Sequence, residues 1–145
     1  MTERELVEDI LKRNRYLVLS TAQDSSPWVA PLEYMIDEDL NFYFLSTDDS
    51  LHVRHLESNE KVAVAVFEHE QAEYAADASF TLNGVQMEAI ARRLTKVEYT
   101  PAVRAAIAAL DPPMPPYSVF KIVPQRFYLP KIEHGVNKRS EVRVE

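Results

Sequence analysis

The sequence predicts a mostly β protein, a six-stranded antiparallel barrel with flanking helices. Short runs rich in β-branched and aromatic residues recur along the chain, and turn-forming residues join the early runs by hairpin-length links. Only three segments place apolar residues at helical spacing. A chain of 145 residues has the length of one domain, so we expect a single domain over residues 1–145.

The first predicted element is a helix that ends near Asn14. Acidic residues lie toward its start and basic residues toward its end, as the helix dipole favours, and Thr2 is the expected cap. Three strands should follow and pair antiparallel, because turn-forming residues separate them. We expect these strands at residues 16–21, 28–36 and 40–45.

The second half of the chain predicts two further helices and three further strands. A short helix should begin at Ser50, its expected cap, and end near Asn59. An Ala-rich helix at 102–110 should end at the proline-rich run 111–116. Pro124 interrupts the last strand, which predicts a sheet edge or a bulge there. The strands are expected at 62–67, 79–94 and 117–129, with an acidic loop at 69–78 and a polar tail after Lys131.

The composition excludes several classes of protein. The chain has no cysteine, which excludes disulfides, thiolate metal sites and a cysteine nucleophile. A net charge of −7 opposes nucleic-acid binding, which depends on neutralising phosphates. No apolar run approaches the roughly 18 to 20 residues of a membrane span, and the first residues are charged throughout. We therefore expect a cytoplasmic protein that binds neither nucleic acid nor membranes.

Common catalytic and binding motifs are missing from the sequence. The two glycines, Gly84 and Gly135, cannot build a dinucleotide-binding or phosphate-binding loop, which needs several close glycines. His52 and His55 could share a helix face, but no third ligand accompanies them, so no metal site is expected. No serine lies in a nucleophile elbow, and the catalytic residues stay unknown.

Four stretches of the sequence, taken in their order along the chain, carry a resemblance to a known family: LVLST (17–21), SPWVAPL (26–32), FYFLST (42–47) and SLHVRHLESNEKVAV (50–64). Over residues 15–129 this order resembles the FMN-binding split barrel of the pyridoxamine 5'-phosphate oxidase family. The resemblance implies a six-stranded antiparallel split barrel with an FMN cofactor. It also implies a homodimer with two flavins at the interface, for which Trp28, Tyr34 and Tyr128 are candidate contacts.

The resemblance also implies where the cofactor binds. In the family, the end of the third strand and the start of the next helix face the flavin phosphate, which points to Ser46, Thr47 and His52 in this chain. Ser50 fits as the helix cap, since a helix start offers amides and a dipole to a phosphate. Gln86 is the candidate for the polar edge of the flavin ring. A solvent-facing strand residue is the equally open interpretation of Gln86.

This chain departs from the family pattern at several positions. His52 stands where the family often has lysine, and Ala89 where it often has glycine. A neutral His52 offers a phosphate less charge, although its pKa can rise beside a dianion. Ala30 and Leu51 stand where the oxidase itself would have arginines, so the resemblance does not imply oxidation of pyridoxine phosphate.

Three functions remain open at this point. The first is an FMN-dependent oxidoreductase acting on an unidentified small redox substrate, in which no side chain need be catalytic because the flavin supplies the redox chemistry. The second is a noncatalytic module of the same fold that holds a flavin, a deazaflavin or haem. The third is a barrel without a cofactor that serves as a dimeric interaction protein.

Overall fold

The computed structural model describes residues 1–69, 82–110, 117–133 and 136–144. Eight strands form one antiparallel sheet in the order β2-β1-β5-β6-β7-β4-β3, and β8 pairs with β7 outside this path. The strands are β1 Tyr16–Gln23, β2 Ser26–Glu33, β3 Met35–Ile36, β4 Phe42–Ser46, β5 Lys61–His69, β6 Leu82–Arg93, β7 Ser118–Glu133 and β8 Val136–Val142. The helices are α1 Glu3–Arg13, α2 Leu51–Ser58 and α3 Pro101–Ala108, with a short 3-10 turn at Lys96–Glu98.

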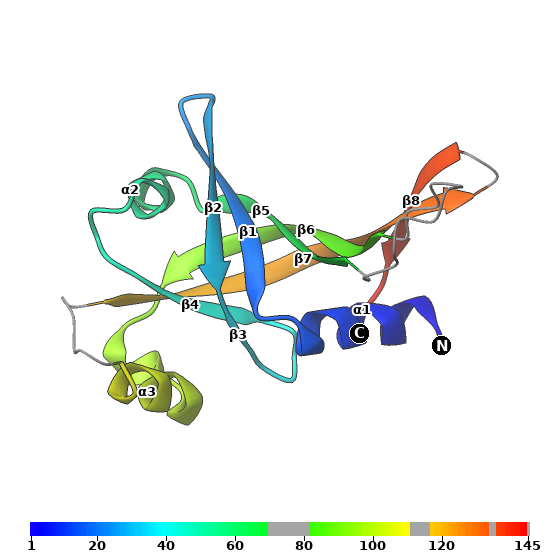
Figure 1. Ribbon diagram of the computed structural model, residues 1–145. Coiled ribbons are helices and arrows are strands. Elements are labelled where there is room, and N and C mark those ends of the chain that lie inside the picture. Colours follow the sequence, from blue (N-terminus) through cyan, green and yellow to red (C-terminus); the bar gives the residue numbers. More distant parts are fainter. Residues whose placement is uncertain (70–81, 111–116, 134–135, 145) are drawn as a thin grey trace.

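The sheet curls into a half-barrel, so the β1–β2 hairpin crosses in front of β6 and β7 in Figure 1. The mostly β prediction is confirmed, but the count of six strands is wrong. The predicted strand 28–36 divides into β2 and β3, because Tyr34 turns into the core and its hydroxyl donates to the Leu11 carbonyl at 2.7 Å. The polar C-terminal segment, which has no strong alternation, forms β8 by pairing with the end of β7.

Helix α1 forms where its sequence predicts it. Thr2 caps it: Thr2 Oγ1 accepts from the Glu5 amide at 3.1 Å, and the Glu5 carboxylate accepts from the Thr2 amide at 3.0 Å. Val7, Ile10 and Leu11 are fully buried against the sheet. The apolar face of α1 thus covers one side of the barrel core.

Pro124 lies where β7 can tolerate a proline. The partners of β7 on its outer edge change here, since pairing with β4 ends at Ile122 and pairing with β8 begins at Phe127. On the other edge, the register with β6 shifts between Glu88 and Ala89. The predicted bulge is therefore present, because a residue without an amide hydrogen falls in the gap between two ladders.

The two faces of the sheet carry different side chains. Phe44 and Phe120 stack at 5.1 Å between ring centroids on the inner face, within the main core. Tyr43 and Val119, one residue away along each strand, lie in a second cluster on the outer face beside α3. Strand alternation thus separates an inner face that reaches α2 from an outer face that reaches α3.

The remaining elements agree closely with the sequence. Helix α2 occupies the predicted span, and α3 begins one residue earlier than predicted, at Pro101, with Thr100 Oγ1 accepting from the Val103 amide at 3.2 Å. The predicted loop after His69, the first residues of the strand predicted at 79–94, and the proline-rich run 111–116 lie outside the described residues. Within the described ranges, every helix is too short or too polar to cross a membrane.

The turn between β1 and β2 is built without glycine. Gln23 pairs with Ser26, and the two residues between them have φ angles of 47° (Asp24) and 66° (Ser25). Two positive φ angles are typical of the type I′ turn that matches the twist of a hairpin. A side chain with a Cβ is strained in this conformation, so the turn costs stability at Ser25.

We expect Ser25→Gly to raise the free energy of unfolding by about 0.5 to 1 kcal/mol, because glycine removes the strain of the left-handed conformation. Urea denaturation measures the difference. Ser26→Gly, one residue later in β2, is the matched control and should lower stability. A loss of stability in Ser25→Gly as well would contradict the interpretation of the turn.

Candidate functional site

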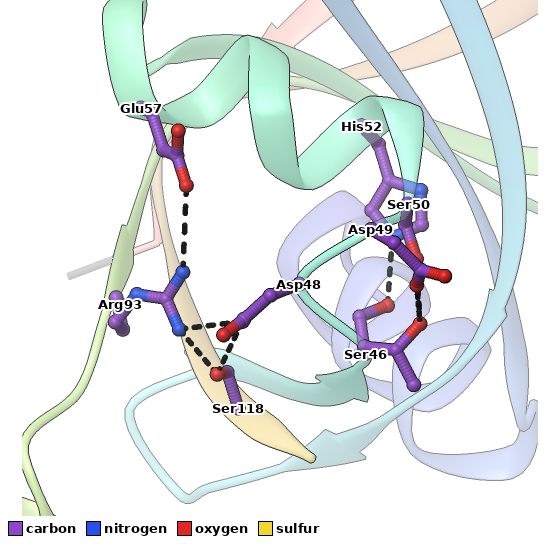
Figure 2. A network of polar contacts seen from close by, with 9 residues as sticks. Ser46, Asp48, Asp49, Ser50, His52, Glu57, Arg93 and Ser118 are labelled. Carbon is purple, nitrogen blue, oxygen red and sulfur yellow. Dashed lines mark hydrogen bonds and ion pairs between the residues drawn. The ribbon is translucent and has the colours of Figure 1, made fainter. Parts of the chain in front are cut away.

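A group of polar side chains gathers where β4 ends and α2 begins. We call it the polar corner, and it consists of Ser46, Thr47, Asp48, Asp49, Ser50 and His52 (Figure 2). Ser46 Oγ lies 2.7 Å from His52 Nε2, and both side chains are buried. The structure therefore brings together four of the five residues that the sequence analysis predicted for cofactor binding.

A second pair of the same chemistry lies one helical turn along α2. Thr21 Oγ1 of β1 lies 3.0 Å from His55 Nδ1, and both residues are buried. His52 and His55 stand three residues apart, so they share the helix face that packs on the sheet. Each imidazole is thus held by a hydroxyl group from a strand, and no cluster of metal-ligating side chains occurs within the described ranges.

The electrostatics of His52 favour its neutral form. Burial lowers the pKa of His52 below its usual 6.5, and the neighbouring His55 lowers the pKa further. The ring of Phe44 is tilted against the His52 ring, with 5.9 Å between the ring centroids, and it contributes to the apolar surroundings of His52. His52 therefore favours the uncharged form at the position where the family pattern often has lysine.

The hydroxyl groups of the loop bond to one another and leave the helix start without a side-chain cap. Thr47 Oγ1 donates to Asp49 Oδ1 at 2.6 Å and lies 3.2 Å from Ser50 Oγ. Ser50 occupies the predicted capping position, but its side chain makes no capping hydrogen bond. The first amides of α2 therefore have no side-chain acceptor from Ser50, which suits an acceptor from outside the chain.

Sequence reasoning missed a cation beside the corner. Arg93, the last residue of β6, donates from Nη1 to Asp48 Oδ1 at 2.8 Å and also hydrogen-bonds to Ser118 Oγ. Ser118 Oγ donates to the same Asp48 oxygen at 2.6 Å, and Glu57 lies 3.8 Å from Arg93 Nη2. The hydrogen bond from Ser118, and then that from Arg93, holds the pKa of Asp48 below its usual range. No local sequence signal could reveal this network, because its members come from two strands, a loop and a helix that are far apart in the sequence.

Gln86 lies apart from the polar corner. Its exposed side chain is on the outer face of β6, whereas Arg93, seven residues later, has the parity of the inner face. Seven residues also span roughly 23 Å along a strand. Gln86 instead lines an open hollow of about 340 Å³ on the outer face, beside Tyr128. The Arg139 guanidinium covers the Tyr128 ring at 4.3 Å from the centroid.

The other residues named in the sequence analysis differ in how far they are exposed. Trp28 is exposed on β2 and Tyr128 faces the outer hollow. Tyr34 is buried, its ring packs edge-on against Phe42 at 4.9 Å, and burial raises its pKa to about 12. Tyr34 therefore belongs to the core of the chain, which does not favour it as an intersubunit contact. Ala30 is buried on β2, and Leu51 is partly exposed at the start of α2.

Comparison with known proteins gives one family match. The family model described as "Pyridoxamine 5'-phosphate oxidase" matches residues 4–130. Among curated proteins, none matches this sequence. Solved structures match the fold over most of the chain at identities of 20% or less for the three described below.

Three solved structures illustrate the range of similar proteins. A protein of unknown function from Agrobacterium tumefaciens, Atu2129, is 19% identical with a TM-score of 0.71, over 88% of this chain and 55% of its own. This chain thus spans little more than half of that protein. An FAD-binding protein from Mesorhizobium loti is 20% identical with a TM-score of 0.66, over 88% and 92%. The haem storage protein HutZ from Vibrio cholerae is 16% identical with a TM-score of 0.65, over 89% and 95%.

The lowered pKa of His52 predicts a dependence of stability on pH. Because the unfolded chain binds a proton on His52 more tightly than the folded chain, this contribution to stability is complete above pH 6.5 and is lost as the pH falls below it. Denaturation measured between about pH 8 and about pH 5 gives the free energy of unfolding at each pH. This free energy should fall less steeply toward low pH in His52→Gln than in the wild type. Arg54→Gln, on the exposed side of α2, should keep the wild-type slope. Equal slopes in all three proteins would contradict the assignment.

Proposed function

This chain belongs to the pyridoxamine 5'-phosphate oxidase family, and we propose that it is an FMN-binding flavoprotein whose polar corner receives the cofactor phosphate. One observation carries the proposal: the hydroxyl groups of Ser46, Thr47 and Ser50 converge on the uncapped start of α2. Hydroxyl donors, helix amides and the helix dipole together suit a dianionic phosphate group. The FAD-binding protein among the similar structures supports a flavin in this fold.

The residues of the corner fit a phosphate when its carboxylates turn away. Asp48 and Asp49 are exposed loop residues, so their side chains can move into solvent without opening the core. The buried Ser46 and His52 are held by their mutual hydrogen bond, and they form the floor of the corner. The corner thus combines a buried floor with an exposed rim, at which a phosphate would enter.

We assign the protein to the oxidoreductases that act on small redox substrates. Bound FMN would supply the redox chemistry, accepting electrons from a nicotinamide or another reduced substrate and passing them to a small acceptor. The chain contributes binding and orientation, with Ser46, Thr47, Ser50 and His52 at the phosphate end. The side-chain amide of Gln86 is suited to a hydrogen bond with the polar edge of the ring.

We propose a homodimer, and the position of Gln86 supports it. Gln86 and the polar corner lie on opposite faces of the sheet, so a flavin at the corner would meet a Gln86 side chain only from a second copy of the chain. The outer face offers an apolar surface for this contact, because Phe67 of β5 is 56% exposed there and Ala63 is exposed on the same face of the strand. We therefore place the interface on the outer face of β5 and β6.

The second candidate function is a haem-binding module without catalysis. The similarity to the haem storage protein HutZ favours it, and the histidine pair of α2 supplies imidazoles. Each imidazole is already bonded to a hydroxyl group and buried, so haem ligation would require α2 to move. An absorbance spectrum of the purified protein separates the two candidates, since flavin and haem have different bands.

Titration with FMN, followed by flavin fluorescence, should give saturable binding in the wild type. We expect Ser46→Ala and His52→Ala each to weaken FMN binding by about 1 to 3 kcal/mol, because each removes a polar group at the phosphate end. Thr21→Val is the matched control: it breaks the other buried pair and should leave FMN affinity unchanged. Equal affinities in all four proteins would place the phosphate elsewhere. Wild-type protein that rejects FMN but gives a haem spectrum would favour the second candidate.

Light scattering should give the mass of a dimer for the wild type. Phe67→Glu should produce monomers, because it buries a charge in the proposed interface. Val97→Glu is the matched control, since Val97 is 90% exposed and lies just beyond the opposite end of β6. A monomeric wild type, or a dimer that tolerates Phe67→Glu, would overturn the proposed interface.

A further inference from the structure

Arg93, the last residue of β6, lies beside the polar corner and contacts both an aromatic ring and acidic side chains. Its guanidinium group lies over the ring of Phe120, 5.1 Å from the centroid, and hydrogen-bonds to both Asp48 and Ser118. Glu57 of α2 lies 3.8 Å from its second terminal nitrogen. Figure 2 shows the guanidinium between the helix above and the loop of Asp48 beside it. Arg93 is therefore a cation held at the mouth of the corner by acidic side chains.

The network of Arg93 and the floor of the polar corner lie side by side. Ser118 pairs with Ser46 across the β7–β4 ladder, so their side chains share one face, with Cβ atoms about 4.5 to 5.5 Å apart. The next pair on this face is Phe120 and Phe44, which stack on each other. Arg93 packs on Phe120 and His52 contacts Phe44, so the two groups flank one floor.

We propose that Arg93 provides the cation for the bound phosphate, and that the Asp48 carboxylate occupies the place of that phosphate until the ligand displaces it. This inference rests on the proposed function and names the group that replaces the lysine of the family pattern. Burial favours the neutral form of His52, and the carboxylates of Asp49 in the corner and of Glu57 beside it repel an anion. A guanidinium released from Asp48 therefore supplies the positive charge that the hydroxyl groups and amides of the corner do not provide.

The exposure of the Arg93–Asp48 pair makes this exchange feasible. The side chains are 40% and 65% exposed, so solvent screens their attraction and Asp48 regains hydration when it leaves. Asp48 offers a single oxygen, Oδ1, which it shares between Arg93 and Ser118. A phosphate dianion offers three oxygens and a second charge, and the planar guanidinium can bind two of them at once.

Two substitutions test the exchange in opposite directions. Arg93→Gln should weaken FMN binding about tenfold or more, because it removes a charge-assisted contact. Asp48→Asn should tighten FMN binding by about threefold to tenfold, because the competing carboxylate is lost while the side chain keeps an acceptor for Ser118. Riboflavin, which lacks the phosphate, should bind the wild type and both variants equally.

The neighbouring arginine offers a matched control. Arg92 pairs with Glu98 at 2.8 Å on the opposite face of β6, in an ion pair of similar exposure. Arg92→Gln and Glu98→Gln repeat the two charge changes away from the corner and should leave FMN affinity unchanged. Equal effects of the Arg92 and Arg93 substitutions, or no gain in Asp48→Asn, would overturn the proposal.

A titration with inorganic phosphate separates this inference from the flavin proposal. The amide NMR signals of Ser46, Ser118 and Arg93 should shift in a saturable way in the wild type, more readily in Asp48→Asn and not in Arg93→Gln. If the wild type rejects FMN yet shows these shifts, the flavin proposal fails and the anion site stands. If the signals do not respond in the wild type or in Asp48→Asn, the assignment of Arg93 is wrong.

Discussion

The pairing of β4 with β7 is the interaction on which the site depends. Strand β7 joins β6 along one edge and shares its other edge between β4 and β8. This arrangement places Ser46 opposite Ser118 and Arg93 opposite Phe120, so three strands meet at one end of the inner face. Pro124 lies between the segment of β7 that pairs with β4 and the segment that pairs with β8. Neither strand needs a hydrogen bond from this residue, so its missing amide hydrogen costs nothing. The long strand can therefore serve two partners in succession.

Helix α2 completes the site, and two buried hydrogen bonds determine how it lies. Burying an imidazole or a hydroxyl group costs free energy unless the group has a hydrogen-bond partner. The pairs Ser46–His52 and Thr21–His55 provide these partners on the helix face that packs on the sheet. No buried side-chain nitrogen or oxygen in the described residues lacks a hydrogen bond. The Ser46–His52 pair joins the start of the helix to the end of β4, and this pair forms the floor of the polar corner.

The charges at the corner account for the departure of this chain from its family pattern. A lysine at the position of His52 would lie in a buried place beside Phe44, where a charge is expensive. Here a neutral histidine fills that place, and the cation comes from β6 on the exposed side of the same floor. An arginine at the rim retains its hydration, and the acidic loop next to it balances its charge.

The sequence alone determined the fold class and the order of most elements, and it predicted four residues that the structure brings together in the candidate site. Alternation, caps and turn residues act over a few positions, and the family pattern covers neighbouring positions around Ser46 and His52, so both are visible in the chain itself. Only the tertiary structure decided that Arg93 joins this group and that Gln86 does not. Asp48 and Ser118 are 70 positions apart, and β6 points Gln86 and Arg93 to opposite faces. Such relations depend on which strands pair and in which register, and local preferences do not contain that information.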